Sequence, residues 1–267
     1  MLCVGQSAKL FMCSASIVTD EIFVITPREQ LQSVVLKYLD DLQESGTSGE
    51  SPQFPEFDYY AADYLDFAEM NLQQFDIQVD QRRKENELIC CVSNLKRALD
   101  CQLECFLHAW QLRDVTRKRN LGLDKKLKFL ADVGVFSSRT ITRFSVLRNK
   151  LEHDFQRPNV ADLEALYDLV TAFVSILQSV IVMRLSSECE MSIYNGLGNE
   201  IGSFSITYVG IQQCFYVTWE VSESDIGEVS ADINSPQDFA YFFRVWYLLS
   251  NREGYGSLEH IRTKLRI

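Results

Sequence analysis

The chain has 267 residues, of which 46% are hydrophobic and 24% are charged, a balance typical of soluble globular proteins. This length suffices for one large domain or two small ones, with a core that needs neither disulfides nor metals. No apolar run reaches the roughly eighteen residues of a membrane span, and the mildly apolar residues 1–18 lack the pattern of a signal peptide. We therefore expect a cytoplasmic protein with reduced cysteines and no membrane partner.

Charge is distributed unevenly along the chain, which has 26 Lys and Arg against 37 Asp and Glu and a net charge of −11. Residues 1–81 contain 3 basic and 14 acidic residues, residues 82–184 contain 18 and 12, and residues 185–267 contain 5 and 11. The net charges of these parts are therefore −11, +6 and −6. A basic centre between acidic flanks favours a polyanionic partner, although solvated basic faces are common on helical domains.

The N-terminal part begins with a predicted hairpin at residues 10–26, where apolar, β-prone segments flank a possible turn at Thr19. Thr26, Pro27 and Glu29 then form the start signal of a helix with a capping box, and apolar residues at helical spacing follow as far as Leu42. Residues 44–55 are rich in Ser, Gly, Glu and Pro, which predicts a loop or linker. A helix is expected at residues 59–70, and alternation at residues 75–79 predicts a strand.

From residue 82 the apolar pattern becomes helical. Helices are predicted at residues 82–118, at residues 123–133 with a stop at Gly134, from about 137 to 155, and at residues 160–185. Pro158 separates the last two. Cys101, Cys105 and His108 have the spacing of three metal ligands on one helix face. A buried face explains the thiols more simply, so we expect no metal or other cofactor.

The C-terminal part alternates apolar and polar residues near positions 191–193, 204–208 and 215–221, which predicts a three-stranded antiparallel meander. Ser235 and Pro236 then cap a predicted last helix at residues 239–249. If the N-terminal hairpin joins the meander in one sheet, the helical domain is an insertion in a small α+β unit. The predicted fold class is therefore α+β, with an N-terminal region at 1–81, an all-helical domain at 82–185 and a meander plus helix at 186–267.

The predicted helix at residues 137–155 has polar residues suited to phosphodiester chemistry. With Leu147 at zero, Leu151 lies at about 40° on the apolar stripe, whereas Asn149 at about 200° and His153 at about 240° lie on the opposite side. Arg148, at about 100°, is at the edge of the stripe. Histidine transfers protons near neutral pH, and arginine holds a phosphate as charge builds on it. RNA supplies its own nucleophile, so this chemistry requires no metal.

The sequence Leu147-Arg148-Asn149-Lys150-Leu151-Glu152-His153-Asp154-Phe155 resembles the signature of HEPN domains (higher eukaryotes and prokaryotes nucleotide-binding). That signature is an Arg, then a polar residue, then a His a few positions later. The predicted helices of residues 82–185 are similar to the four-helix layout of this family, and so is the short helix that ends in Gly-Val-Phe before the motif. The resemblance covers these residues and not the flanking segments.

The resemblance implies a metal-independent endoribonuclease in which two protomers pair, so that both Arg/His sets face one cleft. Arg148 would bind and stabilise the phosphate, His153 would transfer protons, and Asn149 would help to position them. Lys150 and Arg143 are expected to bind RNA. Many relatives act as toxins or in defence against phage, so the expected partners are RNA, a second copy of the chain through the helical domain, and an antitoxin or other regulatory protein.

One departure from the family concerns regulation by an antitoxin that modifies the motif. A subgroup has a Tyr two places after the His, and its nucleotidyltransferase antitoxin modifies that Tyr. This chain has Phe155 at that position, so we do not expect this modification there.

Three alternatives to the ribonuclease remain: a non-catalytic HEPN-like module that binds nucleotide, RNA or protein; a structural protein with an aromatic interface near residues 241–247; and a DNA-binding protein, for which no recognised reading motif is present. The basic tail of Arg262, Lys264 and Arg266 is expected to be a solvated helix end.

Overall fold

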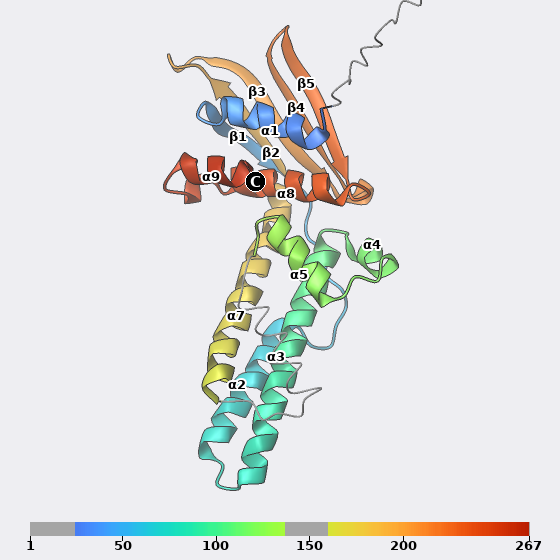
Figure 1. Ribbon diagram of the computed structural model, residues 1–267, viewed down its shortest axis with the longest axis vertical. Helices are drawn as coiled ribbons and strands as arrows, with labels where there is room; N and C mark the ends of the chain where they lie inside the picture. The colour runs from blue at the N-terminus through green and yellow to red at the C-terminus, as the bar shows by residue number, and fades with distance from the viewer. Residues whose placement is uncertain (1–24, 137–159, 267) are drawn as a thin grey trace, which may run out of the picture.

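The computed structural model describes residues 25–136 and 160–266 and has an α+β fold (Figure 1). A curved antiparallel sheet with helices on one face forms one end of the molecule, and long helices extend away from it as a bundle (Figure 1). Most of the predicted hairpin at residues 10–26 and all of the predicted helix at residues 137–155 lie outside the described residues.

Within the described residues, five strands form the sheet in the order β1-β2-β3-β4-β5, and all neighbours are antiparallel. The strands are β1 (Leu42–Ser48), β2 (Glu188–Tyr194), β3 (Glu200–Val209), β4 (Cys214–Ser222) and β5 (Asp225–Asp232). The predicted meander is confirmed as β2, β3 and β4, and β5 adds a strand that the sequence analysis missed. Phe204, Ile206 and Tyr208 of β3 are buried, as their alternation predicted.

Strand β1 corrects the prediction of a loop for residues 44–48, whereas residues 49–55 contain no helix or strand, as predicted. Its sequence, rich in Ser, Gly and Glu, has weak strand propensity, and Leu42 is its one buried residue. The backbone nevertheless pairs with β2, from Leu42 opposite Ile193 to Ser48 opposite Glu188. Backbone hydrogen bonds to β2 therefore hold this segment as a strand in spite of its weak strand propensity. Through this pairing, the N-terminal part of the chain shares one sheet with the C-terminal part.

Helices α1 (Pro27–Tyr38) and α8 (Pro236–Ser250) lie across one face of the sheet (Figure 1). The capping box of α1 is confirmed, because the Thr26 hydroxyl accepts from the Glu29 N–H at 3.2 Å and the Glu29 carboxylate accepts from the Thr26 N–H at 2.8 Å. In α8, Ser235 occupies the N-cap position but its side chain makes no capping hydrogen bond, contrary to expectation. Four of the aromatic residues considered for an interface are core residues: Tyr241, Phe242, Phe243 and Trp246.

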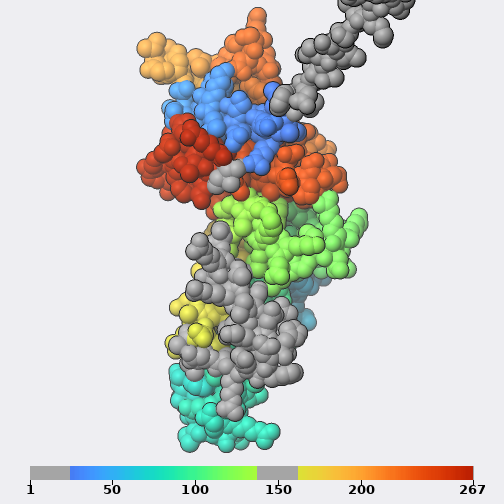
Figure 2. All heavy atoms as spheres, viewed as in Figure 1, coloured from blue at the N-terminus to red at the C-terminus, as the bar shows by residue number. Residues whose placement is uncertain are grey.

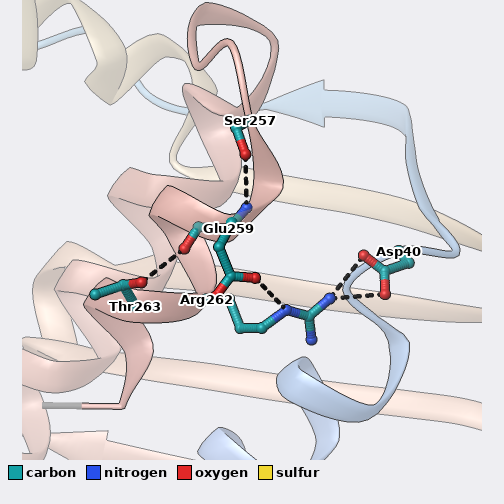
Figure 3. A network of polar contacts seen from close by, with 5 residues as sticks. All are labelled: Asp40, Ser257, Glu259, Arg262 and Thr263. Atoms are coloured by element: carbon teal, nitrogen blue, oxygen red, sulfur yellow. Dashed lines mark hydrogen bonds and ion pairs between the residues drawn. The ribbon is translucent and has the colours of Figure 1, made fainter.

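The basic tail belongs to a further helix, α9 (Leu258–Leu265), which packs on α1. Its residues Ile261 and Leu265 are fully buried. Arg262 donates to both carboxylate oxygens of Asp40, at 2.8 and 2.7 Å, and contacts Glu259 at 3.3 Å (Figure 3). Arg262 therefore anchors α9 beside the end of α1, and the predicted solvated end applies only to the exposed Lys264 and Arg266.

The bundle contains α2 (Ala61–Ile77), α3 (Gln81–Ala109) and α7 (Val160–Val182), with α3 packed against both other helices. Helix α2 corrects the predicted strand at residues 75–79. Phe75 packs under the Lys84 ammonium at 5.0 Å across the α2–α3 turn, while Ile77 and Val79 are 71% and 94% exposed. Five alternating residues fit a helix end as well as a strand. Because α2 packs with α3 and α7, the bundle begins near residue 61 instead of residue 82.

Helix α3 has the predicted apolar stripe, and every residue of it is buried: Leu88, Val92, Leu95, Leu99, Leu103, Phe106 and, just past its end, Trp110. It ends at Ala109, earlier than predicted, because Gln111 adopts a left-handed conformation with φ of 55°. Two short helices follow, α4 (Arg113–Lys118) and α5 (Leu123–Asp132). Gly134, with φ of 79°, ends α5 as the sequence predicted.

Helix α7 and the 3-10 turn Met183–Ser186 complete the described bundle. The stretch Asp162–Ser186 is long and apolar enough to cross a membrane. One face of it is buried, however, at the helical spacing of Leu163, Leu166, Val170 and Phe173, and α7 packs against α3 and α2. Its buried face therefore forms part of the bundle core. The complete four-helix layout stays a prediction, since the expected motif helix lies outside the described residues.

Candidate functional site

The predicted catalytic residues Arg148, Asn149 and His153, and the predicted RNA-binding residues Lys150 and Arg143, all lie outside the described residues. Their roles and relative positions therefore stay predictions. The described chain nevertheless fixes both ends of the segment that contains them. It ends at Phe136 and resumes with α7 at residue 160. The Phe136 ring packs edge-on against Phe173 of α7 at 5.1 Å, so the segment leaves the described structure beside α7.

Helices α4 and α5 form a basic surface immediately before that segment in the chain. Residues 113–128 contain seven Lys and Arg and two Asp, which gives a net charge of +5. Three of these cations have carboxylate partners: Arg113 and Lys126 contact Glu104 at 3.4 and 2.6 Å, and Lys128 contacts Asp132 at 2.5 Å. The uneven charge of residues 82–184 predicts a basic region, and residues 113–128 contain seven of its eighteen Lys and Arg.

The remaining cations of this surface are Arg117, Lys118, Arg119 and Lys125, and all four are exposed. None of them has an ion pair within the described part of the chain, although Arg119 donates to the backbone carbonyl of Ile233 at 3.2 Å. Exposed cations without carboxylate partners attract a polyanion and release its counterions. This surface, defined here as the α4–α5 basic surface, can therefore attract a polyanion.

The uncovered face of the sheet has the opposite character. Residues 185–243, which contain β2 to β5 and the start of α8, have nine Asp and Glu and no Lys or Arg, although Asp225 pairs with Lys37 of α1 on the covered side. The strands place the exposed Glu190, Glu220 and Glu228 among Ser and Thr residues, with Tyr216 42% exposed. A polyanion is repelled by this face, so the described structure separates an acidic end from the basic surface on α4 and α5.

A buried arginine joins the bundle to the sheet. Arg184, 1% exposed, follows α7, and its guanidinium lies over the rings of Trp110 at 5.6 Å and Tyr208 at 5.0 Å. It donates to the Glu50 carboxylate at 2.7 Å. Burial lowers the pKa of Arg184, and the charge of Glu50 opposes that shift. Because these residues come from the bundle, the sheet and the segment after β1, we interpret the cluster as a structural joint and not as a catalytic site.

The three residues with metal-ligand spacing are engaged separately. Cys101 and Cys105 are buried, and the Cys101 thiol contacts the carbonyl of Tyr59 at 3.8 Å. The hydrogen bond that the Cys105 thiol shares with Cys101, and then burial, raise the pKa of Cys105. The His108 Nδ1 atom lies 3.2 Å from the carbonyl oxygen of Gln53. Among the described residues, no three His, Cys, Asp or Glu side chains are grouped as a metal site would require.

No protein-family model matches this chain, and comparison with curated proteins and with solved structures also found no match. The candidate function therefore rests on the motif in the sequence and on the charge and packing of the described residues.

Proposed function

We propose that this protein is a metal-independent endoribonuclease of the HEPN type that acts in the cytoplasm as a toxin or a component of defence against phage. The observation that carries the proposal is the Arg148-Asn149-x-x-x-His153 pattern on a segment predicted to be helical, with Asn149 and His153 opposite the apolar stripe and Arg148 at its edge. Two described features support it. The segment is continuous with helices that pack as a bundle, and the α4–α5 basic surface precedes it in the chain.

The proposed reaction uses the 2′-hydroxyl of RNA as the nucleophile. This hydroxyl loses its proton, its oxygen attacks the adjacent phosphorus, and the bond from phosphorus to the 5′-oxygen breaks. The 5′-oxygen gains a proton, and the products end in a 2′,3′-cyclic phosphate and a 5′-hydroxyl. His153 transfers protons, Arg148 stabilises the charge on the phosphate, and Asn149 positions them. Lys150 and Arg143 bind the backbone, and a homodimer through the helical domain brings two such sets together.

The test is cleavage of an end-labelled RNA pool in EDTA by the wild-type chain and by Arg148→Ala, His153→Ala and the neighbouring control Glu152→Gln. Circular dichroism and thermal unfolding establish that all four are equally folded. We expect cyclic-phosphate ends from the wild type and from Glu152→Gln, and a loss of cleavage of at least about a hundredfold in the other two, since each removes general acid–base or electrostatic catalysis. Equal cleavage by all four chains would show that the site is elsewhere.

A second candidate function is RNA binding without cleavage by a HEPN-like module. The α4–α5 basic surface favours it, because its exposed cations do not depend on the motif for contact with a polyanion. In that case RNA is bound but not cut, Arg148→Ala and His153→Ala leave the affinity unchanged, and expression of the wild-type chain is not toxic. A ribonuclease is instead expected to inhibit growth in a way that His153→Ala relieves.

A further inference from the structure

A cavity lies between the basic helices and the helix that covers the sheet. It is bounded by the end of α3, by α4 and α5, and by the turn from β5 into α8, and it has a volume of about 220 Å³. In Figure 2 the atoms of α4 and α5, in green, adjoin those of α8, in orange and red. The cavity is therefore at the junction of the bundle and the sheet, a place where ligand sites are common.

The wall of this cavity is mainly apolar. The residues that form it include Leu107, Leu112, Val115, Phe129, Ile233 and Ala240. Its hydroxyl group, on Thr116, already donates to the carbonyl of Arg113 at 2.8 Å. A nucleobase placed here would lose hydrogen bonds to water without replacing them, whereas a hydrocarbon group would lose none. The wall therefore selects an apolar group.

The rim of the cavity is cationic. Arg119, Lys125, Lys126 and Lys128 line it, together with the carboxylate of Asp132. Lys126 is paired with Glu104 and Lys128 with Asp132. Arg119 and Lys125 are exposed and have no carboxylate partner within the described part of the chain. A ligand with an anionic group at the rim would form ion pairs with these two cations.

We propose that this cavity binds a small amphipathic anion, with an acyl chain among the apolar residues and a carboxylate between Arg119 and Lys125. The volume is below the roughly 300–1,000 Å³ of sites for drug-sized ligands, so the chain is of medium length. Because the ligand contacts α4, α5 and α8 together, its binding stabilises the junction between the bundle and the sheet. None of the lining residues belongs to the proposed ribonuclease motif, so this proposal does not rest on the proposed function.

The probes are decanoate, octanoate and uncharged decan-1-ol, measured by isothermal titration calorimetry and by the shift of the unfolding temperature. We expect one decanoate per chain. Octanoate should bind roughly tenfold more weakly, since two methylene groups are lost from the apolar contact. Decan-1-ol should bind about fivefold more weakly, since it lacks the charge that exposed cations attract.

Two variants test the placement of the ligand. Arg119→Gln/Lys125→Gln should weaken decanoate about fivefold and leave decan-1-ol unchanged, and Val115→Trp should abolish the binding of both by filling the cavity. The matched control, Arg117→Gln/Lys118→Gln, removes two cations of α4 that do not line the cavity and should bind decanoate as the wild type does. The proposal is overturned if decanoate binds no better than decan-1-ol, if the rim variant binds it unchanged, or if Val115→Trp still binds decanoate.

Discussion

The hydroxyl of Tyr208 donates a buried hydrogen bond of 2.6 Å to the backbone carbonyl of Trp110. This contact joins β3 of the sheet to the turn that ends α3 of the bundle, and the two rings lie 5.2 Å apart. Arg184 covers both rings, and Gly210 leaves room for it, since a Cβ at Gly210 would lie 2.5 Å from the Arg184 Nη2 atom. The relative placement of sheet and bundle therefore depends on a few buried polar contacts.

The first prediction concerns this hydrogen bond. Tyr208→Phe removes the hydroxyl and leaves the Trp110 carbonyl without its donor in a buried place. We expect the free energy of unfolding to fall by about 1–3 kcal/mol, measured by urea denaturation. Tyr216→Phe on the same sheet is the control, because its hydroxyl bonds to Gln212 at the surface and its loss should change stability little. Equal stability of the two variants would contradict the role assigned to Tyr208.

The second prediction concerns the pair of Arg184 and Glu50. Arg184 is buried, whereas the Glu50 side chain is 64% exposed. Glu50→Gln leaves a buried guanidinium without its counter-charge and should lower the free energy of unfolding by about 1–2 kcal/mol. Adding Arg184→Met removes that uncompensated charge, so the double variant should be more stable than Glu50→Gln alone. Glu228→Gln controls for the loss of an exposed carboxylate. A double variant less stable than Glu50→Gln would show that the packing of the Arg184 side chain contributes more to stability than the removal of its charge.

The third prediction concerns pH. Hydrogen bonds from Lys37 and then Tyr38 hold the pKa of Asp225 below its usual value, and the Trp219 indole donates to the same carboxylate at 3.2 Å. A lowered pKa in the folded state adds stability above about pH 4 that is lost as pH falls through the folded-state pKa. Asp225→Asn should therefore be less stable than the wild type at pH 6, and the difference should shrink below pH 4. A difference that stays constant across this range would contradict the linkage.

The fourth prediction concerns the α4–α5 basic surface and RNA. Arg117→Gln/Lys118→Gln removes two exposed cations, and the slope of log affinity against log salt concentration for single-stranded RNA should become less steep by about 1.4, or about 0.7 for each lost phosphate contact. Fluorescence anisotropy with a labelled RNA measures this slope. Lys264→Gln/Arg266→Gln removes two exposed cations from α9 and should leave the slope unchanged; a similar change in both variants would assign the effect to net charge alone.

Local signals predicted several elements correctly. The capping box at Thr26 and Glu29, the apolar stripe of α3 and the stop at Gly134 each depend on residues within a few positions of one another. Their physical cause is the hydrogen bonding and backbone preference of a single helix, so no distant contact is needed to foresee them. The alternation in β2, β3 and β4 is similarly local, because successive side chains of a strand point to opposite faces and one face of each strand is buried.

The wrong predictions fall where local signals are weak. β1 has few residues with strand propensity, and its strand conformation depends on pairing with β2, far away in the chain. The short alternation at residues 75–79 suits a strand or a helix end, and packing of Phe75 against α3 decides for the helix. Helix α9 has only two buried residues, Ile261 and Leu265, and depends on α1 and Asp40 for its place.

The sequence by itself determined the chemistry that this chain offers: a basic centre between acidic flanks, and the arginine, asparagine and histidine of the proposed ribonuclease motif at helical spacing. Only the tertiary structure decided which cations lack carboxylate partners and where a cavity opens beside them. The residues of that cavity come from positions 107 to 240. The residues of the motif are close to one another in the chain, whereas a cavity and its unpaired charges are set by how distant elements pack, which periodicity does not encode.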